Sequence, residues 1–368
     1  MVFGIGLRFF RYWLDFPIWG DEASLALNLR ARDYLGLLRE LDHFQVAPPL
    51  FLWMEKAILS LGGTSVLALR FMPLLAGIAG LLLFWRLARY CLAPSAAVLA
   101  AGLLAVSRWP IELAATVKPY SFDLFLAVTL IFLAIRYSRH GGTVYLACAT
   151  FLIPFAVWLS YPVAFVAGSV SLALLSTIVT RGSSSSRAWF VSFNILLAAA
   201  FLGLLFVVHI GGNPTAPGEL DAYMHGFWRH GFPHGGPFAS LWSGIRVHFG
   251  KMFSYPVEFN GGGLIGLGLL LLGAWTFWRG GQRMLLALCL LPFALHFVAA
   301  IMHRYPYGMH PRLEQHLLPG FCLLAATGCH EAIQLLAGRI AVQFRLMNAV
   351  IIGLILVGIK GALNDMRR

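Results

Sequence analysis

Charged residues are rare in this chain, and acidic residues are scarcer than basic ones. Only 15 of the 368 residues are Asp or Glu, against 27 Lys and Arg, and charged residues make up 11% of the total. Hydrophobic residues make up 59%, and the mean hydropathy is +0.78. A soluble domain of this length carries far more charge, so the composition excludes one and indicates an integral membrane protein.

Cysteine is also scarce, and the cysteines show no metal-ligand spacing. They lie mostly within apolar runs, so we expect them in the core. The five are Cys91, Cys148, Cys289, Cys322 and Cys329. The formal charge of +12 would suggest nucleic acid as a partner of a soluble protein. In a membrane protein, Arg in short cytoplasmic loops explains such a charge better, and we expect no nucleic acid here.

Long apolar runs repeat along the chain, and many reach the roughly 20 residues that a helix needs to cross a bilayer. We predict an all-α, polytopic helical membrane protein of about 10–11 spans, forming a single integral membrane domain over residues 1–368. Ten spans are predicted near residues 65–86, 93–108, 119–136, 143–159, 162–180, 188–210, 263–279, 284–302, 317–336 and 346–362.

The loops between these spans fall into two sets. Basic pairs mark the short loops: Arg86/Arg89, Arg136/Arg139, Arg181/Arg187, Arg279/Arg283 and Arg339/Arg345. The long loops cover 15–64, 109–118, 211–262 and 303–316. The positive-inside rule places the basic set in the cytoplasm and the long set on the extracytoplasmic side of the plasma (inner) membrane. The C-terminal Lys360 and Arg367-Arg368 then lie outside, against the rule.

The N-terminal region departs from a regular span. Residues 1–14 give about 21 Å of helix, against roughly 30 Å of hydrocarbon, so we expect an incomplete span or a helix that starts upstream of Met1. In the first long loop, Leu residues alternate with Arg and Glu over residues 25–41. This pattern predicts a short amphipathic helix on the membrane surface. Pro48-Pro49 then opens a second short helix, 50–61, lying flat or re-entrant.

Asp21-Glu22 is the strongest candidate for a functional site. Seven of the 15 acids fall between Asp15 and Glu55, and acids kept close to hydrocarbon tend to mark function. A helix N-cap explains one acid of the pair but explains less well a second acid beside it. A carboxylate at the membrane boundary can accept a proton from an acceptor hydroxyl near a lipid-borne substrate. We predict a catalytic or ligand-binding role for Asp21.

Two further stretches on the same predicted side carry candidate binding residues. His43 and Gln45 lie in a loop before the double proline and are weak signals alone. Lys118, followed by Tyr120, either snorkels to the headgroups or provides a cation for a phosphate. Asp123 lies one turn into an apolar helix and needs a partner, which Lys118 or another loop cation can supply.

The late loop and the long loop 211–262 add arginines and histidines. The late loop carries Arg304 and Arg312, and an arginine fork can grip phosphate oxygens; the alternative is an ordinary hydrated loop. The long loop contains His225, His230, His234 and His248. Their spacing fits no standard ligand set, so a metal site is possible but not indicated. A lid over a substrate cavity is the better interpretation of that loop.

Taken together, these motifs resemble a known family. The order is Trp-x-Asp-Glu-Ala, then Ala-Pro-Pro-Leu-Phe, then Leu-Arg-Phe-Met-Pro-Leu-Leu-Ala-Gly at 69–77, then Lys-Pro-Tyr-Ser-Phe-Asp, and a late Pro-Arg with a second Pro seven residues after the Arg. It resembles membrane glycosyltransferases of the GT-C type, in the family 39-like group of protein O-mannosyltransferases and aminoarabinose transferases. Each motif alone is weak, but their order and placement are fairly specific, and the resemblance covers most of the chain.

The resemblance implies a GT-C fold and a sugar donor carried on a polyprenyl phosphate. It implies inverting transfer with Asp21 as general base, Glu22 as its catalytic neighbour, and Lys118 and Arg312 near the donor phosphate. The late loop departs from the family at Glu314-Gln315-His316, where relatives often have Tyr and apolar residues. A C-terminal soluble domain found in some relatives is not seen.

Other functions remain open on the sequence alone. A transporter or flippase of lipid-linked sugars is the main alternative, and a non-catalytic relative is another. Transporters usually place their ionisable sites near the bilayer midplane, whereas most acids here fall in outer loops. The expected partners are the lipid-linked donor, membrane lipids, and an acceptor that is a glycolipid, a polysaccharide or a protein. No cofactor is indicated.

Overall fold

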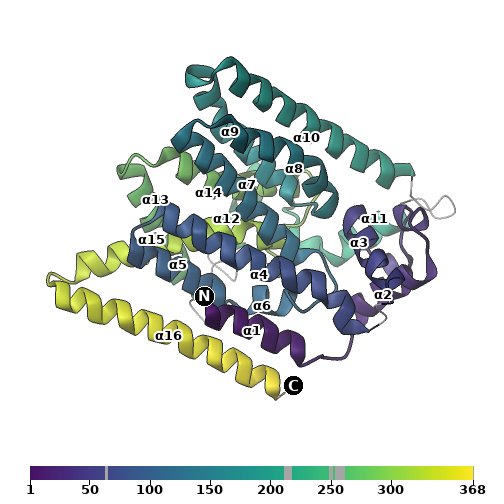
Figure 1. Cartoon of the computed structure of the whole chain (residues 1–368), viewed down its shortest axis with the longest axis horizontal. Coiled ribbons are helices and arrows are strands. Elements are labelled where there is room, and N and C mark those ends of the chain that lie inside the picture. Colours follow the sequence, from purple (N-terminus) through teal and green to yellow (C-terminus); the bar gives the residue numbers. More distant parts are fainter. Residues whose placement is uncertain (63–64, 211–217, 248–251, 253–261, 368) are drawn as a thin grey trace.

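The protein is helical throughout the part of the chain that the structure describes. In this computed structural model the described residues are 1–62, 65–210, 218–247, 252 and 262–367, and they contain no β-strand. Figure 1 shows long helices packed side by side, with several shorter helices gathered at one end of the bundle. This architecture agrees with the predicted all-α class.

Every one of the ten predicted spans is a helix. Their bounds are α4 (Val66–Cys91), α5 (Pro94–Val106), α7 (Tyr120–His140), α8 (Thr143–Leu159), α9 (Val163–Arg181), α10 (Ser184–Ile210), α13 (Gly262–Arg279), α14 (Arg283–Ile301), α15 (Leu318–Leu336) and α16 (Ile340–Met366). Within the described residues, seven helices are long and apolar enough to cross a membrane. Of the other three, α5 and α8 are apolar but shorter. The chain is therefore a multi-pass membrane protein.

The N-terminal segment forms a helix that is built into the bundle. α1 (Val2–Trp13) packs against α4, α5 and α16, and Figure 1 shows α1 and α16 side by side. Arg8 is fully buried, and its Nη1 donates to the carbonyls of Gly4 at 2.9 Å and Ala105 at 3.2 Å. Arg11 Nη1 lies 2.7 Å from Asp365 Oδ1, which joins the C-terminal ends of α1 and α16. Backbone carbonyls within the bundle therefore accept the hydrogen bonds of this buried guanidinium.

The first long loop is largely helical. It contains α2 (Gly20–Ala31), the 3₁₀ turns η1 (Gly36–Leu38) and η2 (Asp42–Phe44), and α3 (Pro49–Ser60). The predicted helix over 25–41 is therefore too long, because the chain turns after Ala31. In that turn Asp33 Oδ1 accepts a hydrogen bond from the Gly36 amide at 2.7 Å. Leu25 and Leu29 are fully buried, so α2 packs into the protein. The short helix predicted over 50–61 is confirmed as α3.

The later loops also contain helices. α6 (Arg108–Leu113) precedes α7; α11 (Glu219–Phe227), η3 (Arg229–Gly231) and α12 (Pro237–Val247) lie in the long loop; and η5 (Pro311–Leu317) lies in the late loop. The Phe44 and Tyr223 rings stack with centroids 4.2 Å apart, which joins α11 to η2. These contacts bring the first and the long loop together at one end of the bundle, where Figure 1 shows α2, α3 and α11.

The cysteines divide into two groups. Cys91, Cys289 and Cys322 are buried, as the sequence predicts. Cys148 is exposed on α8 and Cys329 is only partly buried. The prediction of a core position was therefore wrong for Cys148, because an apolar helix that faces lipid carries apolar residues on its outer side as well.

Candidate functional site

Asp21 and Glu22 are adjacent in the first turn of α2 but face different surroundings. The Asp21 side chain is 36% exposed, whereas Glu22 is 1% exposed. Arg312 Nη1 donates to Asp21 Oδ2 at 3.0 Å across 291 residues of sequence. This ion pair therefore joins the start of the first long loop to the late loop, two parts of the predicted site that lie far apart in the sequence.

Glu22 is held in a buried network. Arg70 on α4 donates from Nη2 to Glu22 Oε2 at 2.9 Å and from Nε to Oε1 at 3.3 Å. The Val117 amide donates to Glu22 Oε1 at 2.7 Å, and Arg70 Nη1 donates to the Phe16 carbonyl at 2.8 Å. These bonds tie α2 to α4 and to the segment before α7. They give Glu22 a structural function in positioning Asp21, and its catalytic role stays a prediction.

Lys118 is buried beside this pair. Its Nζ donates to Gln45 Oε1 at 2.6 Å, and the residue is 5% exposed. Burial lowers the pKa of Lys118 to about 8; the Asp21 carboxylate opposes this shift and the Arg312 guanidinium adds to it. The ammonium is thus mostly protonated at neutral pH and has a neutral partner, which leaves its charge available to an anion.

Arg312 combines one ion pair with one unused donor. Its guanidinium carbon lies 4.9 Å from the centre of the Trp228 ring, a distance that allows a cation–π contact. Its Nε is buried without a hydrogen-bond partner in the described structure. Its backbone amide donates to His310 Nδ1 at 3.2 Å, which fixes the start of η5. A buried donor without a partner is costly, and a phosphate or sugar oxygen would satisfy it.

The remaining predicted binding residues divide into those near the site and those away from it. Tyr120, at the start of α7, packs on an apolar cluster that contains Trp228. Gln45 is buried and holds Lys118. His43 is exposed, and only its carbonyl is engaged, accepting a bond from Gln45 Nε2 at 3.2 Å. Arg304 is exposed, and its side chain makes no hydrogen bond or ion pair with the described residues. No described contact joins His43 or Arg304 to Asp21.

The predicted partner for Asp123 was wrong. Lys118 donates to Gln45 instead, and Asp123 Oδ1 is buried without a hydrogen-bond partner among the described residues. The pairing failed because the loop folds back so that α2 and η2 supply the neighbours of Lys118. Other buried polar side chains also have atoms without a hydrogen-bond partner among the described residues, including Ser160, His296, Glu314 and His316.

Two functional neighbours escaped sequence reasoning. In the sequence, Arg70 appears only as part of an apolar motif. A lone arginine near the start of a long apolar helix needs an acidic partner, and Glu22 needs a cationic one. Trp228 lies in the long loop that we expected to form a lid over a substrate cavity, but the sequence does not indicate that this residue contacts Arg312. The first of these residues could have been found from charge pairing, and the second required the fold.

The histidines of the long loop do not form a metal site in the described structure. No group of three or more His, Cys, Asp or Glu among the described residues can hold a metal ion. His225 Nε2 lies 3.6 Å from Asp221 Oδ1, and His234 Nε2 lies 3.0 Å from the Arg229 carbonyl. His248 lies outside the described residues.

Comparison with known proteins agrees with this architecture. Residues 46–210 match the family model for dolichyl-phosphate-mannose-protein mannosyltransferase. No protein in the set of curated sequences matches the chain.

Two solved structures share the fold. The apo crystal structure of ArnT from Cupriavidus metallidurans superimposes with a TM-score of 0.59 at 12% identity, covering 98% of this chain and 73% of ArnT. The crystal structure of the same ArnT bound to undecaprenyl phosphate gives 0.58 at 13% identity, covering 98% and 74%. The family match covers residues 46–210, and the two solved structures show that the chain has the GT-C fold.

Proposed function

We propose that the chain transfers a sugar from a polyprenyl-phosphate-linked donor to an acceptor hydroxyl at the extracytoplasmic face, with inversion and with Asp21 as general base. The Asp21–Arg312 contact at 3.0 Å carries this proposal. Asp21 presents a partly exposed carboxylate to two cations, Arg312 and Lys118. The carboxylates of the described residues leave part of the positive charge of each cation unpaired. The structural similarity to an ArnT that binds undecaprenyl phosphate supports the choice of donor.

The proposed reaction needs one proton acceptor and one stabilised leaving group. Asp21 takes the proton from the acceptor hydroxyl as the acceptor oxygen bonds to the anomeric carbon. The bond from that carbon to the phosphate oxygen breaks on the opposite face, and its electron pair leaves with the lipid phosphate. The side chain of Asp21 is 36% exposed, which leaves an oxygen accessible to a hydroxyl.

Arg312 links donor binding to base activation in this mechanism. Its Nη1 holds Asp21, and its Nε is buried without a partner in the described structure. A donor phosphate competes with Asp21 for the guanidinium, because both are anions that accept from the same fork. As the phosphate takes the fork, the Asp21 carboxylate is released to accept a proton. Lys118 adds a second fixed positive charge, which stabilises the developing phosphate charge.

The position of the site favours transfer over transport. Asp21 lies in the first turn of α2, before the ten predicted spans, and its partner Arg312 lies in η5 before α15. Both are therefore at helix ends, whereas transporters usually place ionisable sites near the midplane on broken spans. A non-catalytic relative would not need a partly exposed carboxylate beside an arginine whose Nε has no hydrogen-bond partner among the described residues.

The test begins with the product. Mass spectrometry of membrane glycoconjugates from a deletion strain and from wild type identifies a modification that requires the chain, and complementation then compares variants. Asp21→Asn keeps the size and one acceptor oxygen for Arg312 but removes the base. We expect transfer to fall by about 10²–10⁴-fold, the usual contribution of a positioned base.

The matched control is Asp33→Asn in the same loop. Asp33 is also a carboxylate after α1, but its oxygen accepts from the Gly36 amide and does not face Arg312. We expect near-normal transfer from this variant. Near-normal transfer by Asp21→Asn at equal protein level would overturn the base assignment, and an unchanged glycoconjugate profile in the deletion strain would overturn the transferase itself.

A further inference from the structure

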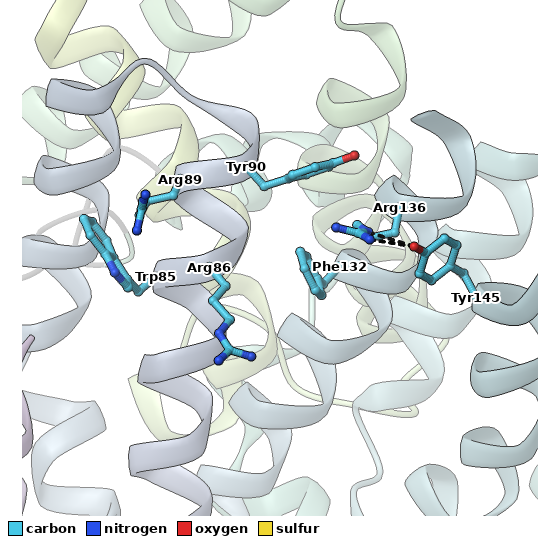
Figure 2. A pocket seen from close by; sticks show the side chains of 7 residues that line it. All are labelled: Trp85, Arg86, Arg89, Tyr90, Phe132, Arg136 and Tyr145. Atoms are coloured by element: carbon cyan, nitrogen blue, oxygen red, sulfur yellow. Dashed lines mark hydrogen bonds between the residues drawn. The ribbon is translucent and has the colours of Figure 1, made fainter. Parts of the chain in front are cut away.

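A pocket of about 600 Å³ opens between α4, α7 and α8, away from the Asp21 site. Three arginines line it: Arg86, Arg89 and Arg136. Figure 2 shows their side chains together with four aromatic rings from the same helices. Nothing in the proposed transfer uses these residues.

The pocket and the Asp21 site occupy opposite ends of the same two helices. On α4, Arg86 lies 16 residues after Arg70, which is about 24 Å of helix. On α7, Arg136 lies 16 residues after Tyr120, which gives the same separation. The two helices pack together and both begin at the Asp21 end. The pocket is therefore a separate site at the far end of the bundle.

The arginines of this end are held by rings and by neutral oxygens. Arg136 donates from Nη2 to the Tyr145 hydroxyl at 2.6 Å, and Arg139 donates from Nη1 to the Tyr90 carbonyl at 2.6 Å. The Arg89 guanidinium carbon lies 5.5 Å from the centre of the Trp85 ring. These contacts orient the guanidinium groups without neutralising them.

The positive charge of the pocket has no acidic counterpart. Arg86 is exposed and its side chain has no hydrogen bond or ion pair with the described residues. None of Arg89, Arg136 and Arg139 forms an ion pair in the described part of the chain either. The sequence has no Asp or Glu between Glu55 and Glu112. An anion from outside the protein is the remaining way to balance this charge.

The surroundings of the pocket indicate a lipid as the source of that anion. α4 and α7 are both long and apolar enough to cross a membrane, and the pocket lies near their C-terminal ends. Leu82 on α4 is 45% exposed and Val144 on α8 is 59% exposed, so apolar side chains face outward beside the arginines. Tyr and Trp next to Arg at a helix end are typical of the level of lipid headgroups.

We propose that this pocket binds the phosphate headgroup of an anionic membrane lipid, in the leaflet at the arginine-rich end of the bundle. The arginine forks hold the phosphate oxygens, the rings pack against the glycerol region, and the acyl chains lie along the exposed apolar faces of α4 and α8. This inference is independent of the proposed transfer.

Native mass spectrometry of the purified protein tests the proposal. The delipidated chain is mixed with equal amounts of phosphatidylglycerol and phosphatidylcholine, and the ratio of the two lipids retained is measured. We expect wild type to retain phosphatidylglycerol preferentially. Arg86→Gln/Arg136→Gln should lower that preference about tenfold or more, because it removes two charged hydrogen-bond donors to the lipid phosphate.

Two companion variants keep the test decisive. Arg86→Gln alone removes an exposed side chain without structural partners, so it tests binding even if the double variant misfolds. Arg279→Gln/Arg283→Gln is the matched control, because Arg283 also lies over a ring, with its guanidinium carbon 5.2 Å from the centre of Trp278. We expect the control to bind like wild type.

Three results would overturn the proposal. The first is an equal loss of phosphatidylglycerol in the control and in the pocket variants, which would show general attraction to basic ends. The second is an unchanged preference in both pocket variants. The third is displacement of the lipid by an equimolar amount of inorganic phosphate, which would make the ligand a free phosphate and not a lipid.

Discussion

The two ends of α4 and α7 both gather arginines, but they compensate the charge differently. At the Asp21 end, Arg70 and Arg312 are largely buried and each has a carboxylate within 3.0 Å. At the far end, Arg86 and Arg89 are exposed, the Arg89 guanidinium lies over the Trp85 ring, and Arg136 donates to the neutral Tyr145 hydroxyl. One end is therefore charge-paired internally, and the other depends on its surroundings for anions.

This difference teaches which charges are structural and which are available. A buried cation needs a close anion or neutral hydrogen-bond acceptors, because water no longer screens or solvates it. Glu22 meets that need for Arg70 completely, whereas Asp21 meets it for Arg312 only in part, since Arg312 Nε remains without a partner in the described structure. The incomplete pair is where a substrate phosphate can enter. Five predictions test this distinction between fixed and available charge.

Arg312→Gln should have the largest effect. Removing a group that stabilises transition-state charge typically lowers the rate by about 10²–10³-fold, and we expect that loss in transfer by membranes that carry the variant. Arg304→Gln is the matched control in the same late loop, because Arg304 is exposed and its side chain makes no hydrogen bond or ion pair with the described residues. Equal losses in the two variants would remove the special position of Arg312 and restore the predicted role of Arg304.

Glu22→Gln should mainly reduce stability. Glu22 and Arg70 are 1% and 3% exposed, and removing one charge of a buried pair costs about 3–5 kcal/mol. Thermal unfolding of the purified protein in detergent measures the change. Asp42→Asn is the control, since the Asp42–Arg32 pair lies on the surface and contributes at most about 1 kcal/mol. A Glu22→Gln protein with wild-type stability and no transfer would make Glu22 catalytic.

Lys118 should give transfer an alkaline limit with a midpoint near pH 8. Its pKa is lowered to about 8 by burial, so the ammonium loses its proton as the pH rises through that value, and its hold on the phosphate weakens. Lys118→Arg should abolish that limit, because arginine stays charged. Profiles of transfer between pH 6 and 10 for both proteins provide the measurement, and an identical alkaline limit in the variant would contradict the assignment.

The same residue should influence stability with the opposite sign. Between about pH 8 and the ordinary lysine value of 10.5, the unfolded chain binds more protons at Lys118 than the folded chain. Stability therefore rises with pH across that window, while transfer falls. A parallel fall of both quantities would indicate general unfolding and would argue against titration of the site.

The sequence predicted the helices better than their environments. Apolar length alone located all ten segments, because a helix in lipid must satisfy its own backbone and has few alternatives. It could not show that Arg8 would be buried among carbonyls of α5, or that Cys148 would face outward, because apolar composition does not distinguish a lipid-facing position from a core position. Nor could local pattern show that α2 stops at Ala31 and that the chain then turns.

The site could be predicted as a set of charges but not as a set of pairs. Because acidic residues are scarce, Asp21 and Glu22 stood out as candidate site residues. The predicted topology placed Arg312 and Lys118 on the same side of the membrane as this pair. The pairing depends on contacts across 48 and 291 residues of sequence, which periodicity does not encode. Lys118 was therefore expected as one possible partner of Asp123, whereas the fold pairs it with Gln45.

Tyr145→Phe should have the smallest effect and tests the arginine-rich end alone. The Tyr145 hydroxyl accepts from Arg136 Nη2 at 2.6 Å and from Nε at 3.2 Å. Its loss should lower the free energy of unfolding by about 0.5–1.5 kcal/mol, the usual net value of a hydrogen bond. Tyr137→Phe is the control, since that hydroxyl makes no hydrogen bond with the described residues. Transfer should stay normal in both variants, because about 24 Å of helix separates this end from Asp21. A tenfold fall in transfer with Tyr145→Phe alone would show that the two ends of the bundle are coupled and do not act as separate sites.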